Sequence, residues 1–454
     1  MRYYSTRDKN RAVSFATAAL EGLAPDGGLY IPETLPHYTS AVKNSLSTMS
    51  LDEIAFETIR PFVAGEIPAG VLEELVQDAF NFPAPLVTAD DRLVMELYHG
   101  PTAAFKDFGA RFMARAFSYL RRGEDRRLRI LVATSGDTGG AVADGFFGVE
   151  GIDVTVLYPK GRVSPLQERQ IAGLGGNVSA CAVEGSFDDC QAMVKAIFNR
   201  PDIRSRFALS SANSINIARL VPQTIYYSAA AGRAWAGKTD PEGPASARVR
   251  PAPAARGATA DSVAICVPSG NFGNLTAGMY AREMGAPISL FVAATNLNKT
   301  VPDYLESGEY RTRESRATLS NAMDVGAPSN FERMSAQYSH AELSRLIKGV
   351  WVDDADTTAT IKDVFERSGY VLDPHTAVGW KGIDRLEATN GALAGARVVM
   401  STAHPAKFAE TVEPVCGALR MPPSLVAAMD RSVVAQTIAA SPEALVEVLE
   451  HSGT

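Results

Sequence analysis

The sequence predicts an α/β protein with mostly parallel sheets and a mainly helical N-terminal region. Up to about residue 85 the chain carries helix-like stretches at 51–63 and 69–80, and the proline-containing connector "NFPAPL" ends this part. Beyond it, short β-rich apolar runs alternate with helix-like segments. Such alternation is typical of β-α-β units, in which ligands bind at the carboxyl ends of the strands.

The individual elements follow from the spacing of apolar residues and from capping signals. Strands are expected at 92–97, 128–134, 152–159, 177–183, 263–268, 288–294 and 396–401, and helices at 107–120, 140–147, 186–198 and 273–285. The stretch "SPLQ" predicts a capping box between Ser164 and Gln167. Ser186 and Asp107 are expected to cap the helices that begin beside them.

Composition and charge limit the classes of function. The 454 residues carry a formal net charge of −7, which argues against nucleic acid or an anionic membrane surface as the main partner. Cys181, Cys190, Cys266 and Cys416 lack C-x-x-C spacing, so we expect free thiols and neither disulfides nor a metal site. The sequence shows no secretory signal and no membrane-spanning run, which favours a cytoplasmic protein without membrane partners.

The loop "VPSGNFGNLTAG", residues 267–278, follows an apolar strand and precedes a helical pattern. In this arrangement backbone N–H groups and a helix N-terminus can hold a phosphate. Gly270 and Gly273 would let the backbone approach the anion, while Ser269 and Asn274 offer polar side chains. The lysine of a nucleotide P-loop is missing, so a small phosphate site fits better than a nucleotide site. A plain turn without a ligand is the alternative.

A second glycine-rich loop, "ATSGDTGGAVADGF", also joins a strand to a helix. Ser135, Gly136, Asp137 and Thr138 stand at the helix N-terminus, where backbone N–H groups and hydroxyls suit a ligand carboxylate. The alternative is that Ser135, Asp137 or Thr138 only caps the helix.

Lys106 lies in the apolar stretch "HGPTAAFKDFG". Lysine is almost never fully buried unless it is paired or chemically employed. A lysine amine has a pKa of about 10.4 in water, and an apolar environment lowers the pKa, so that the amine can form a Schiff base. An amine nucleophile and a phosphate loop in one chain suggest pyridoxal 5′-phosphate (PLP), although a solvated surface lysine is the ordinary alternative. The role of His99 stays open.

Two other stretches carry polar side chains beside strands. Thr402 follows the strand at 396–401, where its hydroxyl could face a cofactor ring, whereas His404 by itself is more typical of a structural histidine. In "LSSANSINIARLVPQT" the polar side chains are denser than helix capping requires, which indicates ligand contact. They are Asn213, Ser214, Asn216 and Arg219.

With these motifs in order, the sequence resembles the threonine synthases, PLP enzymes of fold type II in the tryptophan synthase β-like superfamily. "YYSTR" and "GLAPDGGLYIPE" are similar to the N-terminal signatures of that family, and "HGPTAAFKDFG" resembles its PLP-lysine motif. "ATSGDTGGAV", "YPKGRVSPLQERQ", "SSANSINIAR", "VPSGNFGNLTAG", "AMDVGAPSNFER" and "STAHPAKF" follow in family order.

The resemblance implies a role for each motif. Lys106 would bind PLP covalently and then move protons, the loop Ser269, Gly270, Asn271, Phe272, Gly273 and Asn274 would hold its phosphate, and Thr402 would bond the pyridine nitrogen. The substrate carboxylate would lie at 135–138, where an Asp at 137 is electrostatically awkward. Candidates for the substrate phosphate are Lys160, Arg162, Ser214, Asn216, Arg219, Asn330 and Arg333.

The reaction implied is β,γ-replacement on O-phospho-L-homoserine, giving L-threonine and phosphate. The alternatives are a phospho-lyase or a serine or threonine dehydratase on the same scaffold, and a PLP-fold protein that only binds a phosphorylated metabolite. The expected partner is this small molecule, in a monomer or homodimer.

The resemblance also implies a division into domains. An N-terminal threonine-synthase-type domain (1–90) would precede a large PLP-binding α/β domain (91–130 and 205–430), a small α/β domain (131–204) and a C-terminal helical tail (431–454). The segment 231–261, rich in Ala, Pro, Gly and Arg without periodicity, is expected to be a disordered loop.

Overall fold

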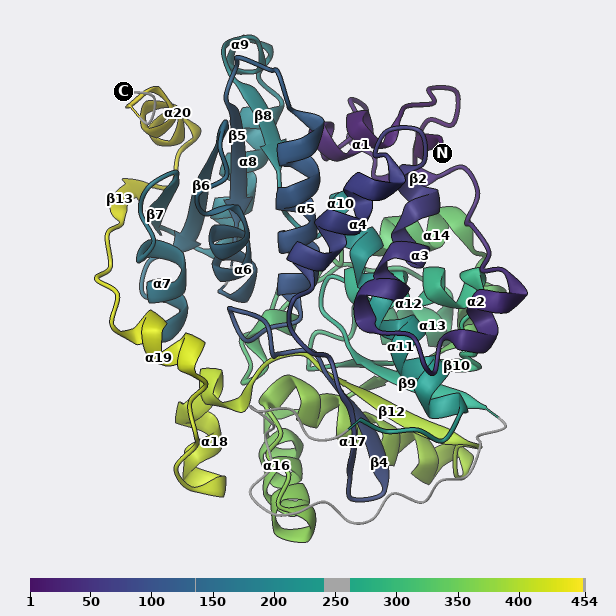
Figure 1. Ribbon diagram of the computed structural model, residues 1–454. Coiled ribbons are helices and arrows are strands. Elements are labelled where there is room, and N and C mark those ends of the chain that lie inside the picture. The colour runs from purple at the N-terminus through teal and green to yellow at the C-terminus, as the bar shows by residue number, and fades with distance from the viewer. Residues whose placement is uncertain (135, 241–261, 452–454) are drawn as a thin grey trace.

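Two sheets built mainly from parallel strands organise the computed structural model, which describes residues 1–134, 136–240 and 262–451 (Figure 1). The predicted α/β class with parallel sheets and a mainly helical N-terminal region is confirmed. Within the described residues, no helix is both long and apolar enough to span a membrane. The four cysteines are free thiols.

The larger sheet has the strand order β11-β10-β9-β12-β4-β3. All its neighbours are parallel except β3 and β4, which form an antiparallel pair at one edge. Its strands are β3 (Leu86–Ala89), β4 (Arg92–Glu96), β9 (Val263–Pro268), β10 (Leu290–Thr295), β11 (Ile347–Trp351) and β12 (Ala396–Ser401).

The smaller sheet is parallel throughout, in the order β13-β7-β6-β5-β8. Its strands are β5 (Leu128–Ala133), β6 (Ile152–Pro159), β7 (Val178–Glu184), β8 (Ala208–Ser211) and β13 (Gln436–Ala439). This sheet extends beyond the range 131–204 expected for the small domain, because β5 begins earlier and β8 lies later in the chain. The C-terminal tail (431–454), expected to be helical, contains the helix α20 and also the strand β13, which pairs with β7.

The N-terminal region combines a short antiparallel pair with four helices. The pair is β1 (Tyr3–Ser5) and β2 (Tyr30–Pro32), and the helices are α1 (Phe15–Glu21), α2 (Ser40–Ser45), α3 (Leu51–Val63) and α4 (Ala69–Ala79).

The helices that pack on the two sheets or connect them are α5 (Lys106–Leu120), α6 (Asp137–Phe146), α7 (Pro165–Ala172), α8 (Phe187–Phe198), α9 (Pro201–Arg206), α10 (Ile217–Leu220), α11 (Thr224–Trp235), α12 (Gly273–Met284), α13 (Thr300–Ser307), α14 (Phe331–Gln337), α15 (His340–Leu346), α16 (Asp354–Ser368), α17 (Pro374–Asn390), α18 (Ala409–Cys416), α19 (Pro423–Met429) and α20 (Pro442–His451). Three short 3₁₀ helices complete the set: η1 (Val221–Gln223), η2 (Asn321–Met323) and η3 (Pro405–Phe408).

Two of the three predicted helix caps are confirmed. The Ser164 hydroxyl accepts the backbone N–H of Gln167 in a complete capping box, and Ser186 caps α8. Asp107 does not cap α5: this helix begins at Lys106, and the buried Asp107 carboxylate instead accepts hydrogen bonds from Thr102. A carboxylate inside the first turn can reach back to the preceding loop, and sequence position alone does not reveal that choice.

The segment 231–261 begins as a helix. Residues 231–235 form the last turns of α11, where Ala231 and Ala234 are buried, so composition placed the start of the loop too early. Alanine is a strong helix former, and its abundance here extends α11. Residues 241–261 lie outside the part of the chain that the structure describes.

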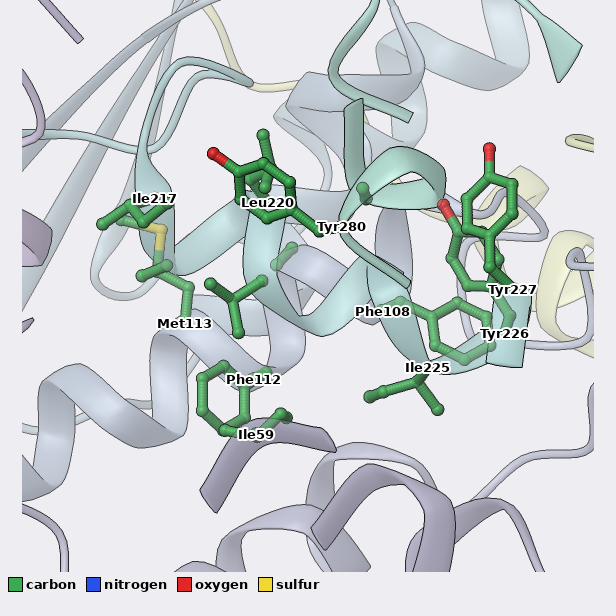
Figure 2. Close-up of a cluster of buried hydrophobic side chains, with 14 of the residues drawn as sticks. Ile59, Phe108, Phe112, Met113, Ile217, Leu220, Ile225, Tyr226, Tyr227 and Tyr280 are labelled. Carbon is green, nitrogen blue, oxygen red and sulfur yellow. The ribbon is translucent and has the colours of Figure 1, made fainter. Parts of the chain in front are cut away.

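One buried cluster connects the helices that carry the site (Figure 2). Ile59 of α3 packs near Phe112 of α5, and the aromatic rings of Phe108 and Tyr226 meet edge to face with centroids 5.1 Å apart. Such aromatic contacts add about 0.5–1.5 kcal/mol beyond area burial. Because α5, α10, α11 and α12 all contribute to this cluster, their ends are fixed relative to one another.

Candidate active site

A cavity opens where strands of both sheets end. The residues that follow β5, β9 and β12 line it, and the carboxyl ends of parallel strands are where ligands bind in such sheets. Its lining also includes the starts of α5, α6, α8 and α12, the loop before α10 and the region around η2. Both sheets therefore contribute to a single site.

The loop after β9 forms a cradle for an anion. The backbone N–H groups of residues 270–274 have no hydrogen-bond acceptor among the described residues, and α12 begins at Gly273 without a side-chain cap. Phe272 adopts a left-handed conformation (φ 60°), which turns the chain into the helix while its ring stays buried. Unpaired N–H groups at a helix N-terminus attract a phosphate or carboxylate.

The side chain of Asn274 is oriented by two tyrosines. The hydroxyls of Tyr226 and Tyr227 both donate to Asn274 Oδ1, each at 2.7 Å. The Nδ2 group of Asn274 consequently has no partner within the described chain, although it is buried beside the cavity. A buried donor without an acceptor is costly, so its position indicates a ligand acceptor in this cavity.

Lys106 begins α5 and extends its amine into the cavity. Its side chain is 14% exposed, and its Nζ lies 3.5 Å from Asp137 Oδ2. Burial lowers the pKa of Lys106, an effect that the nearby Asp137 opposes and that Lys407 and Arg219 reinforce. A lysine with a lowered pKa is available as a nucleophile and as a base.

Asp137 begins α6, and its carboxylate faces three donors: Lys106, Lys407 and Gln167. Asp137 Oδ1 accepts from Lys407 Nζ at 2.8 Å and from Gln167 Nε2 at 3.0 Å. Burial raises the pKa of Asp137, but the ammonium groups of Lys407 and Lys106 and the hydrogen bond from Gln167 outweigh it and hold the pKa well below its usual range. Gly136 precedes it with φ 145°, a conformation that favours glycine.

Neither Asp137 nor Thr138 caps α6 with its side chain. Thr134 Oγ1 accepts the N–H groups of Gly136 and Gly139, at 3.0 and 2.8 Å. Ser135, the third expected contributor to this loop, lies outside the described residues. Gly136, Asp137 and Thr138 remain grouped at the end of β5.

A second polar corner lies at the loop before α10. Arg219 is buried, donates through Nη1 to the carbonyl of Ala212 at 2.6 Å, and has no acceptor at Nε among the residues described. The Oδ1 of Asn213 is also buried without a donor, and Ser214 lies beside it in the cavity lining. A buried guanidinium with a free N–H is suited to a phosphate or carboxylate.

Thr402 and His375 form the wall at the end of β12. Thr402 is buried, and its carbonyl accepts the N–H of Phe105, which fixes the chain immediately before Lys106. His375 Nδ1 donates to Asp373 at 2.8 Å, and its Nε2 accepts the N–H of Ala322 at 3.2 Å. The hydrogen bonds of His375 thereby anchor η2 over the cavity.

Comparison with known proteins decides the family. The family model "Threonine synthase N terminus" matches residues 2–80, "Pyridoxal-phosphate dependent enzyme" matches 83–402, and "Threonine synthase, C-terminal" matches 376–449. The threonine synthase of Haemophilus influenzae is 41% identical over 92% of each chain. The chain belongs to the threonine synthase family. It is a PLP-dependent lyase of fold type II.

Solved structures of threonine synthases have the same fold over their full lengths. The crystal structure from Escherichia coli gives a TM-score of 0.87 at 37% identity, covering 99% of this chain and 100% of that one. The PLP-bound threonine synthase from Brucella melitensis gives 0.87 at 36% identity, covering 100% and 99%.

The residues of the cavity fit PLP, the cofactor of this family. The cradle at 270–274 offers several unpaired N–H donors to a phosphate, and Asn274 adds its free Nδ2. Lys106 supplies the amine, and Thr402 lies at the end of β12. A Cβ at Gly273 would come within 3.1 Å of Asn330, so the tight approach of the cradle requires a small residue there.

Several candidates from the sequence of this threonine synthase family member do not line the cavity. Lys160 and Arg162 are exposed, and Lys160 Nζ lies 3.5 Å from Glu184. Asn216 is buried but caps α10 and donates to the carbonyls of Ala19 and Ser211. These contacts occupy the side chain of Asn216, so the structure gives it a role in fixing the loop.

Asn330 and Arg333 lie behind the cavity wall. Arg333 is buried and donates to Tyr30 O at 3.0 Å, to Asn330 Oδ1 at 2.5 Å and to Ile215 O. Asn330 Nδ2 donates to Ser214 O at 3.3 Å. Both side chains therefore support the loop that carries Ser214.

Sequence reasoning missed three residues of this site: Gln167, His375 and Lys407 had no assigned role in it. Lys407 had the same signal as Lys106, an ammonium group in the apolar stretch "STAHPAKF". Gln167 was interpreted only as a cap, although its amide also reaches Asp137. His375 carried no local signal, because its partners come from distant loops.

Proposed function

We propose that the chain converts O-phospho-L-homoserine and water into L-threonine and phosphate. The observation that carries the proposal is one cavity with two separate places for anions. The cradle at 270–274 suits the phosphate of the cofactor, and the corner at Arg219 suits the phosphate of the substrate. Lys106 projects into the same cavity.

PLP, when bound, supplies an electron sink for negative charge that develops at the substrate Cα. Lys106 Nζ would then accept the Cα proton, give it up so that the amine is neutral again, and next accept a proton from Cβ. Its lowered pKa supports this role, because an amine must be neutral to accept a proton. The net reaction breaks the bond between Cγ and the phosphate oxygen, moves a proton from Cβ to Cγ to give the methyl group, and adds the hydroxyl of water at Cβ, while the remaining proton of that water leaves with the phosphate.

The cofactor phosphate would be held by Gly270, Asn271, Phe272, Gly273 and Asn274, mainly through backbone N–H groups, in a loop that Ser269 begins. Thr402 would face the pyridine nitrogen. The hydroxyl of Ser269 donates to Val267 O at 2.8 Å, so its contribution is to shape the loop. Its backbone N–H is likewise used, by Ala294 O.

The substrate carboxylate would lie at the start of α6, on the N–H groups after Gly136 and the hydroxyl of Thr138. Asp137 is not part of that contact, because its two oxygens face Lys106, Lys407 and Gln167. The substrate phosphate would be held by Arg219 with Ser214 and Asn213. This assignment leaves out Lys160 and Arg162, which are exposed.

One assay tests the proposal. Purified holoenzyme is incubated with O-phospho-L-homoserine, and phosphate, L-threonine and 2-oxobutyrate are quantified in the same samples. We expect equal amounts of phosphate and threonine. Phosphate with 2-oxobutyrate and no threonine would identify a phospho-lyase instead. No turnover in a preparation that shows the cofactor absorbance would leave only a binding protein.

A further inference from the structure

A second lysine is buried beside Lys106, and the proposed reaction does not use it. The side chain of Lys407, on η3, has no exposed surface. Its Nζ donates to Asp137 Oδ1 at 2.8 Å and to the carbonyl of Thr102 at 2.9 Å. A fully buried ammonium group is rare unless paired, so this pair has a role in the site or in the fold.

The distances assign the carboxylate mainly to Lys407. Asp137 Oδ1 lies 2.8 Å from Lys407, whereas Asp137 Oδ2 lies 3.5 Å from Lys106. The site thus holds two lysines for one carboxylate, and the shorter contact belongs to the lysine outside the chemistry. If Lys106 loses its proton, Asp137 still has a cationic partner.

We propose that Lys407 is a positioning residue that forms a neutral ion pair with Asp137, so that Lys106 can release its proton without leaving a buried carboxylate unpaired. The inference rests on the proposed role of Lys106 as the amine that binds PLP and moves protons. It adds a residue that acts on Lys106 through Asp137.

The charges that face Lys106 come from three elements. Among the described residues, the charged groups that shift the pKa of Lys106 are the carboxylate of Asp137 on α6 and the cations Lys407 on η3 and Arg219 on α10, and Asp324 also lines the cavity. Without Lys407, Asp137 would have Lys106 as its only cationic partner within 4 Å, and the ammonium form of Lys106 would be favoured. Without Asp137, the two remaining cations would favour the neutral amine.

The pair also connects the two sheets. Asp137 and Gln167 belong to helices that follow strands of the smaller sheet, while Lys407 follows β12 of the larger sheet. The bond from Lys407 to Thr102 fixes the loop that leads into α5. Lys407 thereby sets both the charge at Asp137 and the position of Lys106 relative to it.

The test is a spectroscopic pH titration of the holoenzyme without substrate. Visible absorbance of the cofactor bound to Lys106 is recorded across pH for wild type, Lys407→Met, Asp137→Asn and the double variant. We expect the midpoint to rise by about one pH unit in Lys407→Met and to fall in Asp137→Asn. The double variant, which removes one charge of each sign, is expected to titrate between Asp137→Asn and wild type.

Two controls separate positioning from folding. Lys407→Arg keeps the charge and should keep the midpoint, and Lys348→Met removes a partly buried lysine on β11, outside the cavity lining. If Lys407→Met lowers thermal stability but titrates like wild type, the pair is structural and the proposal fails. If Lys407→Met does not fold, the midpoints of Asp137→Asn and of the double variant still show whether removing Lys407 raises or lowers the pH midpoint.

Substrate is absent from the titration, so its result does not depend on which product the enzyme makes. A normal product assay with an unmoved midpoint would overturn only the role of Lys407. A failed product assay with the expected shifts would overturn only the proposed reaction.

Discussion

Asp107 holds the loop before α5: its Oδ2 accepts the backbone N–H of Thr102 at 2.9 Å and its Oδ1 accepts the Thr102 hydroxyl at 2.5 Å. The carbonyl of the same Thr102 accepts Lys407. Burial raises the pKa of Asp107 to about 6, although the hydrogen bonds from Thr102 oppose that rise. The loop that leads into Lys106 therefore depends on a carboxyl group with a raised pKa.

This relationship predicts how stability depends on pH. A raised pKa means that the folded state binds the proton of Asp107 more tightly than the unfolded chain does. The free energy of unfolding of wild type, relative to Asp107→Asn, should therefore fall by about 2 kcal/mol as pH rises from 4 to 6. Above pH 7 the difference should be constant.

Urea denaturation of both proteins from pH 4 to 8 measures this difference. The asparagine variant also changes the contact with Thr102, which adds an offset independent of pH. Parallel stability curves over the whole range would contradict the prediction.

Replacing Lys106 should abolish the chemistry and leave the fold intact. Lys106→Ala is expected to lose more than 10³-fold in turnover and the visible absorbance of bound PLP, since we propose the amine as both the attachment point and the base. Its matched control is Lys160→Ala, which removes an exposed lysine paired with Glu184. We expect the control to keep wild-type turnover. Turnover by Lys106→Ala, or loss of turnover in Lys160→Ala, would contradict the assignment of Lys106 as the lysine that carries the chemistry.

The free amide of Asn274 should contribute to cofactor binding. Asn274→Ala is expected to weaken PLP binding about 5- to 10-fold, because it removes one donor worth about 1 kcal/mol. Tyr227→Phe removes one of the two hydroxyls that orient the amide and should have a smaller effect, since Tyr226 still donates to Oδ1. Fluorescence titration of the cofactor-free proteins measures both. Equal affinity in wild type and Asn274→Ala would show that Nδ2 faces no ligand.

Arg219 should determine affinity for the phosphorylated substrate. Arg219→Met is expected to raise KM about 10- to 100-fold, as a charge-assisted hydrogen bond contributes about 1.5–3 kcal/mol. Arg162→Met is the control, because Arg162 was a candidate from sequence but is exposed. The cofactor absorbance should persist in both variants, which separates substrate binding from cofactor binding. A normal KM in Arg219→Met would place the substrate phosphate elsewhere.

The parts of the fold that local pattern controls were predictable. Apolar runs located β5, β6, β7, β9 and β12, and serine followed three residues later by glutamine located the start of α7. Strand β13 was missed because it is four residues long and largely exposed, and its strand conformation depends on pairing with β7 from a distant part of the chain. No periodicity marks such a strand.

The site shows the same limit. The glycine loops were found from sequence because a strand, glycines and a helix start occur within a few residues. The direction of a side chain depends on partners that are distant in the sequence. For this reason the sequence did not show that Asn216 and Lys160 point away from the cavity. Both stand in polar motifs, yet one caps a helix and the other is exposed. Lys407 was overlooked because its apolar stretch is only a weak local signal and its partners, Asp137 and Thr102, are distant in the sequence.

The position of β13 has a consequence for movement around the cavity. The chain passes from the larger sheet to the smaller after β4, returns after β8, and passes back again between β12 and β13. Three covalent crossings, rather than two, therefore link the bodies on either side of the cavity. A motion that admits substrate must bend all three at once, which favours a small rotation about a shared hinge over a sliding separation.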